Sequence, residues 1–314
     1  MKFTAFVMDP MDKISPKTDS SFALMLAAQK RGSRLLHVRP DSLELDGAQV
    51  WLKGMEVKVC DGVAQYFEMV APVKVRAEEC QAIFIRTDPP FDLSYLNVTW
   101  ILSFAAKAGV LVVNSPDGIR AANEKLYALN FIDLCPNTII SSDRERIIDV
   151  LSSWGGEGII KPIDGHGGFG VMRLRDQDSN LRAIVDLLTI EGTQPIVLQE
   201  YLSEAIDGDK RLILIDGELR GAIQRIPPSG DHRGNVHVGG TVSPVDPDDR
   251  DFEIATEMRK QLKQDGLFFV GIDVIAGKLI EVNVTSPTLL REISALGGPN
   301  LAQEIIDAVF LTRS

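Results

Sequence analysis

The chain has 314 residues, which is long enough to bury a sizeable core, and we expect two or three subdomains. Its formal net charge is −11 and it has no run of lysines and arginines, which argues against a broad nucleic-acid-binding face. No stretch approaches the ~20 apolar residues of a membrane span, and the short apolar run at the amino terminus is broken at Asp9 and Pro10. We therefore expect a cytoplasmic protein with neither nucleic acid nor membrane as a partner.

The first part of the chain alternates predicted strands with predicted helices. Residues 3–7 form an apolar run typical of a buried strand, and residues 22–29 carry apolar side chains at helical spacing. The pattern recurs with a strand at 82–85, a helix at 95–107 and a strand at 110–113. This alternation predicts a doubly wound, mostly parallel α/β amino-terminal domain, which we place at residues 1–122.

Polar residues follow the early strands of this predicted sheet. Asp19 and Ser20 come after the first strand and Arg86 comes directly after a later one. Ligands of open parallel sheets bind beyond the carboxyl ends of the strands, so these three side chains are candidate substrate contacts. The alternative is that they only cap helices and shape turns.

Two further units are predicted beyond residue 122. The first, residues 123–200, is a small α+β unit with helices at 124–134 and Leu181–Leu188 and strands at 158–161, 171–175 and 196–199. The second, residues 201–314, has strands at 211–215, 221–226, 268–275 and 279–282 and helices at 252–264 and Leu301–Leu311.

A long polar segment interrupts the last unit at residues 227–247. It is rich in glycine, proline and aspartate and shows almost no regular pattern. Loops longer than about 12–15 residues are usually functional or disordered. We expect a lid that orders over the active site and excludes water, with Arg233 completing a cationic cage; a passive surface loop is the alternative.

A glycine-rich loop lies between two of the predicted strands. Its glycines are Gly165, Gly167, Gly168 and Gly170, and the run Val171-Met172-Arg173-Leu174-Arg175 after it alternates as a strand does. A dinucleotide fingerprint would instead open a helix, so we expect a hairpin flap whose backbone N–H groups cover phosphate. Lys161, just before the loop, favours this function over a simple turn, and no P-loop sequence is present.

Acidic side chains sit among apolar ones near the carboxyl end. Glu281 and Asn283 are two residues apart and so share one face of a strand, and a hairpin could bring Asp273 opposite them. Buried carboxylates held together are most cheaply neutralised by a hard cation, and this oxygen-only set suits Mg²⁺, with Mn²⁺ as a substitute. Pairing with basic neighbours is the alternative.

Five motifs, in this order and spacing, make the chain resemble the ATP-grasp superfamily. They are Asn123-Glu124-Lys125, Ile160-Lys161-Pro162 with its glycine loop, Gln199-Glu200-Tyr201-Leu202, Gly208-Asp209-Lys210-Arg211, and Asp273 with Glu281-Val282-Asn283. Further segments resemble bacterial glutathione synthetases over nearly the whole chain. These are Val7-Met8-Asp9-Pro10, Asp19-Ser20-Ser21-Phe22-Ala23, Arg86-Thr87-Asp88-Pro89-Pro90-Phe91-Asp92, Arg225-Ile226-Pro227 and Asn283-Val284-Thr285-Ser286-Pro287-Thr288.

The resemblance implies an ATP-grasp fold behind the amino-terminal domain, and it implies roles for particular residues. Nucleotide contacts are implied for Lys125, Lys161, the four loop glycines, Gln199, Glu200, Tyr201, Leu202 and Asp209. Catalytic contacts to the phosphates are implied for Arg211, Arg225 and Arg233. Substrate contacts are implied for Asp19, Ser20, Arg86, Ser286, Thr288 and Arg291, and Mg²⁺ contacts for Asp273, Glu281 and Asn283. His166 and Phe169 depart from the residues expected in the loop.

The implied reaction is the ATP-dependent joining of γ-glutamylcysteine to glycine through an acyl phosphate. By the same likeness we expect a homo-oligomer, and specifically a tetramer. Other ATP-grasp ligases, such as a D-alanine–D-alanine ligase or a glutamate-adding ligase, would share the nucleotide residues but not the amino-terminal motifs. A nucleotide-binding module of the synapsin kind would share the fold without the ligase activity.

Overall fold

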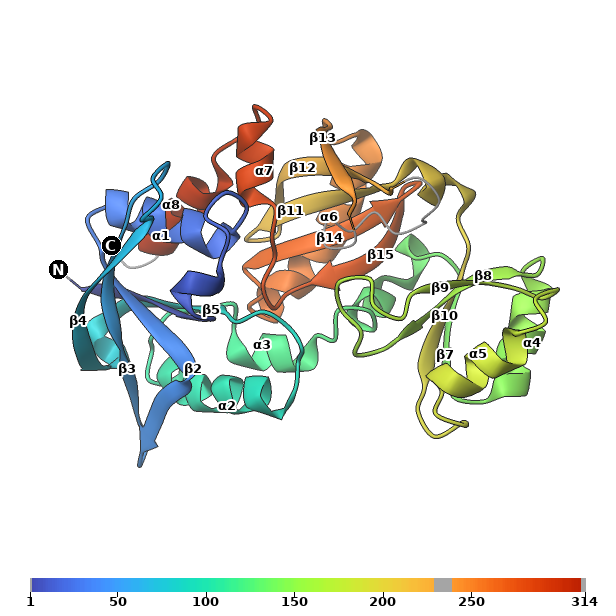
Figure 1. Cartoon of the computed structure of the whole chain (residues 1–314), viewed down its shortest axis with the longest axis horizontal. Helices are drawn as coiled ribbons and strands as arrows, with labels where there is room; N and C mark the ends of the chain where they lie inside the picture. Colours follow the sequence, from blue (N-terminus) through green and yellow to red (C-terminus); the bar gives the residue numbers. More distant parts are fainter. Residues whose placement is uncertain (1, 229–238, 312–314) are drawn as a thin grey trace.

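Three β-sheets lie side by side along the long axis of the molecule (Figure 1). The structure is a computed structural model that describes residues 2–228 and 239–311. The three sheets fall within the three ranges expected from the sequence, 1–122, 123–200 and 201–314. The domain boundaries themselves stay a prediction. No helix in the described residues is long and apolar enough to cross a bilayer.

The amino-terminal sheet has six strands in the order β4-β3-β2-β1-β5-β6. Its strands are β1 (Phe3–Met8), β2 (Arg34–Asp46), β3 (Gln49–Val59), β4 (Phe67–Arg76), β5 (Cys80–Arg86) and β6 (Val112–Val113). The strands β2, β1, β5 and β6 run parallel, as the alternation predicts, and α1 (Ser20–Lys30) and α2 (Leu93–Lys107) follow as expected. The side chains of β1 alternate between two cores, with Phe6 facing α1 and Val7 facing α2, so helices cover both faces.

An antiparallel ribbon extends this sheet and was not predicted. β2, β3 and β4 pair antiparallel and carry the sheet outward from β1 (Figure 1). The turn between β2 and β3 begins at Gly47, whose φ of 59° suits glycine. The Asp46-Gly47 dipeptide before a run of β-formers is the signal that indicates this hairpin.

The small sheet has four antiparallel strands in the order β7-β10-β8-β9. It lies at the right of Figure 1, away from the amino terminus. They are β7 (Thr138–Ser141), β10 (Ile196–Glu200), β8 (Glu157–Pro162) and β9 (Met172–Arg175), with α4 (Arg144–Ser153) and α5 (Leu181–Leu188) packed on one face. The pairing of β8 with β9 confirms that a hairpin carries the glycine loop.

The helix predicted at 124–134 is wrong in its first turn and in its type. Residues Tyr127–Leu134 form a 3₁₀ helix, η3, with a kink at Phe131. The Asn123 side chain accepts hydrogen bonds from the N–H groups of Lys125 and Leu126, and the Glu124 carbonyl accepts one from Val282 N–H. These contacts hold residues 123–126 against a distant strand, so tertiary contacts override the local helical pattern.

The carboxy-terminal sheet has five antiparallel strands in the order β13-β12-β11-β14-β15. They are β13 (Thr241–Pro244), β12 (Glu218–Ile226), β11 (Asp209–Ile215), β14 (Phe269–Ile275) and β15 (Lys278–Asn283). The central strand β11 is buried on both faces: Leu212 and Leu214 pack with α6 (Asp249–Gln264), while Ile213 and Ile215 pack with α7 (Leu290–Ala295) and α8 (Leu301–Leu311).

The expectation of no regular structure across 227–247 is wrong at β13, which pairs with β12 through residues such as Thr241 and Ile226. Residues 229–238, at the centre of the expected lid, lie outside the described residues. Arg233 is among them.

The first and last units share one core. α8 packs on α1, and a single apolar cluster joins Phe6 and Phe84 to Ile213 and Leu301. Asn114, at the end of β6, exchanges hydrogen bonds with Phe269: its side chain donates to the Phe269 carbonyl and accepts from the Phe269 N–H, both at 2.7 Å. The carboxyl edge of the amino-terminal sheet is thereby fixed against the carboxy-terminal sheet, and a cleft forms where they meet.

Candidate active site

Two adjoining cavities lie where the three sheets meet. The first, called here the nucleotide cavity after the nucleotide contacts that the family resemblance implies, is lined mainly by the small and carboxy-terminal sheets and by the glycine loop. The second, called the substrate cavity after the substrate contacts implied in the same way, is lined mainly by loops that follow β1 and β5 and by the segment after β15. Six residues line both cavities: Glu124, His166, Gly167, Arg211, Arg225 and Asn283. We call these six the shared wall.

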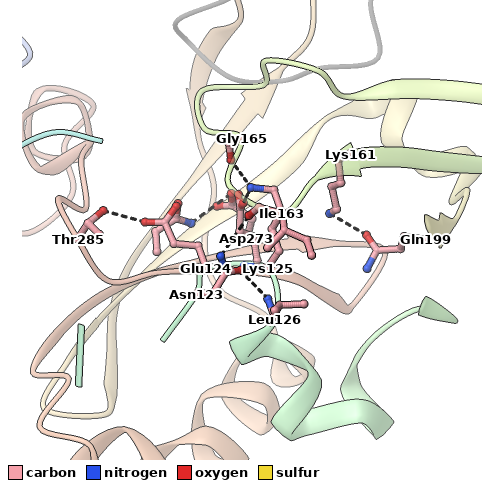
Figure 2. Close-up of polar contacts among 12 residues, drawn as sticks. Asn123, Glu124, Lys125, Leu126, Lys161, Ile163, Gly165, Gln199, Asp273 and Thr285 are labelled. Carbon is pink, nitrogen blue, oxygen red and sulfur yellow. Dashed lines mark hydrogen bonds and ion pairs between the residues drawn. The ribbon is translucent and has the colours of Figure 1, made fainter. Parts of the chain in front are cut away.

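Two buried lysines stand in the nucleotide cavity (Figure 2). Lys161, on β8, donates a hydrogen bond of 3.2 Å to Gln199 Oε1 on β10, and burial lowers the pKa of its ammonium group. Lys125 Nζ lies 3.2 Å from Glu281 Oε1 and also donates to the Gly165 carbonyl. Two cations that are already desolvated and aimed into a cavity suit the binding of phosphate.

The glycine loop covers one side of this cavity. Gly165, Gly167 and Gly168 line it, and Gly167 and Gly168 have φ values of 62° and 81°, which glycine adopts at little cost. Gly170 does not line it. A Cβ there would lie 2.7 Å from the Pro162 ring, so Gly170 lets the loop close on β8.

The segment after β10 lines the opposite side. Gln199, Glu200, Tyr201 and Leu202 all reach the cavity, as predicted for an adenine-binding edge. The Arg173 guanidinium lies 3.7 Å from the centre of the Tyr201 ring, which joins the small sheet to this segment by a cation–π contact.

Four buried charged residues form a network at the floor of the cavity. Asp273 accepts hydrogen bonds from Arg211, at 3.0 Å from Nη2, and lies 2.9 Å from Arg225 Nη2. Arg225 Nε also donates to Asp209 Oδ2 at 3.0 Å. Burial alone would raise the pKa of Asp273, but the two guanidinium groups hold it below its ordinary range. The network thus pairs two carboxylates with two guanidinium groups, and its arginines, Arg211 and Arg225, belong to the shared wall.

Asp273, Glu281 and Asn283 meet as the sequence predicts. Asp273 is directly opposite Glu281 in the β14–β15 hairpin, and Asn283 Nδ2 lies 3.5 Å from Asp273 Oδ2. All three line the nucleotide cavity. Two carboxylates and an amide oxygen fit a hard cation such as Mg²⁺, and both carboxylates now neutralise cationic side chains that such an ion could replace.

The substrate cavity holds Arg86, Asp19, Ser286 and Thr288 as predicted. Arg86 is buried; its Nε donates to Ser21 Oγ and its Nη2 to the Pro287 carbonyl, both at 2.9 Å. Its Nη1 is buried and finds no hydrogen-bond partner among the described residues. Burial lowers the pKa of this guanidinium, so an anionic partner would be strongly favoured.

Two other predicted substrate contacts are occupied elsewhere and do not line either cavity. Ser20 Oγ is buried and accepts a hydrogen bond from Leu290 N–H at 3.2 Å. Arg291 donates to both carboxylate oxygens of Asp61, at 2.9 and 3.0 Å, and to the Lys17 carbonyl. These contacts suit positioning roles, with Arg291 tying the β3–β4 turn to the loop before α1.

The sequence did not single out Glu124, His166 or Tyr95 as site residues. Glu124 Oε1 accepts a hydrogen bond of 2.8 Å from Thr285 (Figure 2), and burial and the nearby Glu281 carboxylate raise the pKa of Glu124 to about 7. Tyr95 lines the substrate cavity with a buried hydroxyl. Glu124 lies within the Asn-Glu-Lys motif, but its contact to Thr285 spans 161 positions, which local patterns cannot indicate.

Comparison with known proteins gives one consistent family. The model of the prokaryotic glutathione synthetase amino-terminal domain matches residues 1–120, and that of the prokaryotic glutathione synthetase ATP-grasp domain matches residues 124–298. The chain is 41% identical over 311 residues to a glutathione synthetase of Synechocystis sp., covering 96% of this chain and 97% of that one. It is 40% identical to one of Rhodopseudomonas palustris, covering 99% and 98% of the two chains.

Solved structures of similar fold are more distant in sequence. The D-cycloserine synthetase DcsG superposes with a TM-score of 0.67 at 17% identity, over 99% of each chain. The ATP-grasp ligase PsnB in complex with a minimal precursor superposes with a TM-score of 0.66 at 16% identity, also over 99% of each chain. At such identities these structures establish the fold, which is the ATP-grasp fold.

Proposed function

The chain belongs to the prokaryotic glutathione synthetase family, and from that premise we propose how its two cavities carry out the reaction. That reaction is the ATP-dependent ligation of γ-glutamylcysteine to glycine, which gives glutathione, ADP and phosphate. The observation that carries the proposal is the shared wall, where the nucleotide cavity and the substrate cavity meet at Arg211 and Arg225. Phosphoryl transfer needs the donor in one cavity to face the carboxylate in the other, and this wall is where they can meet.

ATP is proposed to lie between the small and carboxy-terminal sheets. The adenine would contact Gln199, Glu200, Tyr201 and Leu202, which line one side of the nucleotide cavity. Lys125 and Lys161 would hold the phosphates, with the N–H groups of Gly165, Gly167 and Gly168 closing over them. Asp209 would act through its ion pair with Arg225 or contact the ribose.

Divalent metal is proposed to bind at Asp273, Glu281 and Asn283, and we assign it to Mg²⁺, with Mn²⁺ as a substitute. When bound, the metal would neutralise the phosphate oxygens and orient the γ-phosphoryl group. The donors are hard oxygens with no imidazole or thiolate among the three, which suits these ions better than zinc. Lys125 and Arg211, now paired with Glu281 and Asp273, would be released to contact phosphate.

γ-Glutamylcysteine is proposed to occupy the substrate cavity. Arg86 Nη1 is a buried donor without a partner in the described residues, and a carboxylate of the dipeptide would satisfy it. Asp19, Ser286 and Thr288 line the same cavity and offer further polar contacts. The cysteinyl carboxylate would then face Arg211 and Arg225 at the shared wall.

Arg211 and Arg225 are proposed to stabilise the phosphoryl group as it moves from ATP to that carboxylate. Direct attack of an amine on a carboxylate fails because the carboxylate is anionic and oxide is a poor leaving group. Transfer of the phosphoryl group gives an acyl phosphate and ADP; the glycine nitrogen, as the free amine, then bonds to the carbonyl carbon, phosphate leaves, and the nitrogen gives up a proton to solvent. Guanidinium groups fixed beside the reacting oxygens can stabilise this charge without reorganising.

We further propose that the protein acts in the cytoplasm, where ATP is supplied, and that it is a homo-oligomer, specifically a tetramer, by likeness to the family. Domains at 1–122, 123–200 and 201–314 would then supply the dipeptide site, the nucleotide cover and the metal site, respectively. Mass measurement by light scattering at several protein concentrations tests the oligomeric state.

The reaction is tested by incubating the purified chain with ATP, Mg²⁺, γ-glutamylcysteine and glycine. We expect phosphate release matched by a tripeptide of the mass of glutathione, with no release when either amino component is replaced by D-alanine. Phosphate release with D-alanine alone would instead indicate a D-alanine–D-alanine ligase. Nucleotide binding without release under any of these conditions would indicate a binding module of the synapsin kind.

A further inference from the structure

Glu124 differs in position from every other carboxylate of the described cavity walls. The carboxylates of Asp209, Asp273 and Glu281 line only the nucleotide cavity, and those of Asp19 and Asp88 line only the substrate cavity. Each of the remaining described lining carboxylates likewise belongs to a single cavity, whereas Glu124 lines both. The peptide bond forms where the phosphoryl group of one cavity has met the carboxylate of the other, so Glu124 faces the place of bond formation.

Glu124 also differs in its partners. Asp273 is paired with Arg211, Asp209 with Arg225, and Glu281 with Lys125. Among the described residues no lysine or arginine forms an ion pair with Glu124. Its polar side-chain contact is the Thr285 hydroxyl, which donates to Oε1 at 2.8 Å (Figure 2). A carboxylate can accept several hydrogen bonds, so this contact fixes the group and leaves acceptor capacity for a cation.

The backbone around Glu124 is held firmly. Its carbonyl accepts a hydrogen bond of 2.8 Å from Val282 N–H, and Asn123 accepts bonds from the two N–H groups that follow Glu124. The backbone of Glu124 is thus attached to β15, and the Thr285 hydroxyl holds its carboxylate in place on the shared wall. A preorganised group of this kind can position a ligand atom within the narrow limits that a reaction requires.

At the shared wall, the ammonium group of the amino-acid acceptor needs an anionic partner. Arg211 and Arg225 favour the phosphoryl group but repel the ammonium group that an amino acid carries at neutral pH. That nitrogen must nevertheless come within about 3–3.5 Å of the acyl carbon. We propose that Glu124 binds the ammonium group of the amino-acid acceptor and is the anionic side of the glycine subsite. This inference rests on the proposed ligase function.

The test compares a cationic acceptor with an uncharged one. Glu124→Gln keeps the shape and an acceptor for Thr285 but removes the charge, and we expect the KM for glycine to rise about a hundredfold. Hydroxylamine, which is largely uncharged at neutral pH, attacks acyl phosphates directly to give a hydroxamate. We expect Glu124→Gln to form hydroxamate from γ-glutamylcysteine and ATP at a rate within about threefold of wild type, because phosphoryl transfer does not need this charge.

Two further variants separate the charge from its surroundings. Glu124→Asp keeps the charge and should recover much of the affinity for glycine. Thr285→Val removes the hydrogen bond but not the charge, and we expect the KM for glycine to rise less than about tenfold. Circular dichroism and the KM for ATP establish that each variant is folded and binds nucleotide.

The inference is wrong if Glu124→Gln leaves the KM for glycine unchanged, or if it lowers hydroxamate and tripeptide formation equally, since Glu124 would then serve phosphoryl transfer. It is also wrong if Glu124→Asp is as impaired as Glu124→Gln. Failure of the wild-type chain to make tripeptide would overturn the proposed function itself, and that result is independent of the Glu124 variants.

Discussion

The buried arginines of the site have partners of different kinds. On the shared wall, Arg211 and Arg225 are neutralised by Asp273 and Asp209 at hydrogen-bonding distance. In the substrate cavity, Arg86 bonds only to a hydroxyl and a carbonyl, and its Nη1 lacks a partner in the described residues. The charges of the first arrangement are balanced, so under the proposed function these residues would exchange partners when phosphate and metal bind. The second is unbalanced, and an anionic substrate can bind it without first breaking an ion pair.

Among these predictions, we expect the loss of Arg225 and its ion pairs to have the largest effect on kcat and on stability. Arg225→Ala removes a charge beside the moving phosphoryl group, and we expect kcat to fall about 10²- to 10³-fold with a smaller change in the Kd for ATP. It also leaves the buried Asp209 without its hydrogen-bonded partner, while Asp273 keeps Arg211, so stability should fall by about 3–5 kcal/mol. Steady-state kinetics and urea unfolding measure both effects. A variant altered only in ATP affinity would remove Arg225 from the transfer step.

Glu124 sharpens the comparison because this carboxylate of the shared wall forms no ion pair with a lysine or arginine of the described residues. Burial and the Glu281 carboxylate raise the pKa of Glu124 from 4.5 to about 7. Between these two pH values the folded protein keeps the proton on this carboxyl group, whereas the unfolded chain loses it. Stability should therefore fall as pH rises from 4.5 to 7, by about 3 kcal/mol for a shift of this size.

The Glu124→Gln variant has no carboxyl group at this position, so this titration does not affect its stability. We expect its free energy of unfolding, relative to wild type, to increase by about 3 kcal/mol between pH 4.5 and pH 8 in Mg²⁺-free buffer. Urea unfolding across that pH range measures the difference. A difference that stays constant with pH would mean that Glu124 is charged at little cost.

Glu281→Gln tests whether a metal ion takes the place of Lys125 beside the Glu281 carboxylate. The substitution replaces one anionic oxygen ligand by a neutral amide, so we expect kcat/KM for ATP to fall about a hundredfold at limiting Mg²⁺ and to recover partly at high Mg²⁺. Titration of activity with Mg²⁺ checks this. Near-normal turnover at limiting Mg²⁺ would refute the metal assignment.

Arg86→Met tests the unbalanced side directly. Among the described residues Arg86 forms no ion pair, and the nearby Asp19 keeps its hydrogen bond from Phe22 N–H, so we expect stability to change less than for Arg225→Ala. The KM for γ-glutamylcysteine should rise about thirtyfold because a buried charge-assisted hydrogen bond is lost, while the KM for ATP stays close to wild type. Kinetics with each substrate varied in turn measure the split. A larger effect on ATP than on the dipeptide would reverse the assignment.

The sequence predicted the nucleotide side better than the substrate side, and the reason is physical. Lys161 lies on β8, and the glycine loop joins β8 to β9 in the same hairpin. Asp273 faces Glu281 across another hairpin, so local spacing indicates both features. The substrate cavity instead gathers side chains from loops far apart in the chain. Arg86 contacts Pro287 across 201 positions, and no short pattern encodes such a contact.

The fold shows the same division. The parallel strands β1 and β5 were predicted from strand–helix alternation, whereas the antiparallel ribbon β2–β4 was not, although Asp46-Gly47 indicated its first turn. The helix expected at 124–134 failed because contacts from β15 fix residues 123–126. Arg291 was expected to touch substrate only because of the family resemblance, and its partner in the structure, Asp61, lies 230 positions away.

Arg291 can be compared directly with Arg86, because both were predicted to bind substrate, and for Arg291 we expect the smallest effects. Arg291 is paired with Asp61, whose side chain is half exposed, so the ion pair is solvent-screened and should contribute at most about 1 kcal/mol. Arg291→Met should therefore lower stability by no more than that amount and change the KM for γ-glutamylcysteine by less than about threefold. Asp61→Asn should behave in the same way, because it removes the same pair from the other side.

The Arg291→Met and Asp61→Asn double variant completes this test. If the two residues act only on each other, the double variant should be no less stable than either single variant. A rise in KM as large as that of Arg86→Met, found with Arg291→Met but not with Asp61→Asn, would show that Arg291 leaves Asp61 and reaches the substrate. The loop from Lys17 to Asp19 would then close on the dipeptide through Arg291, and the substrate side would resemble the nucleotide side in exchanging an internal ion pair for a ligand.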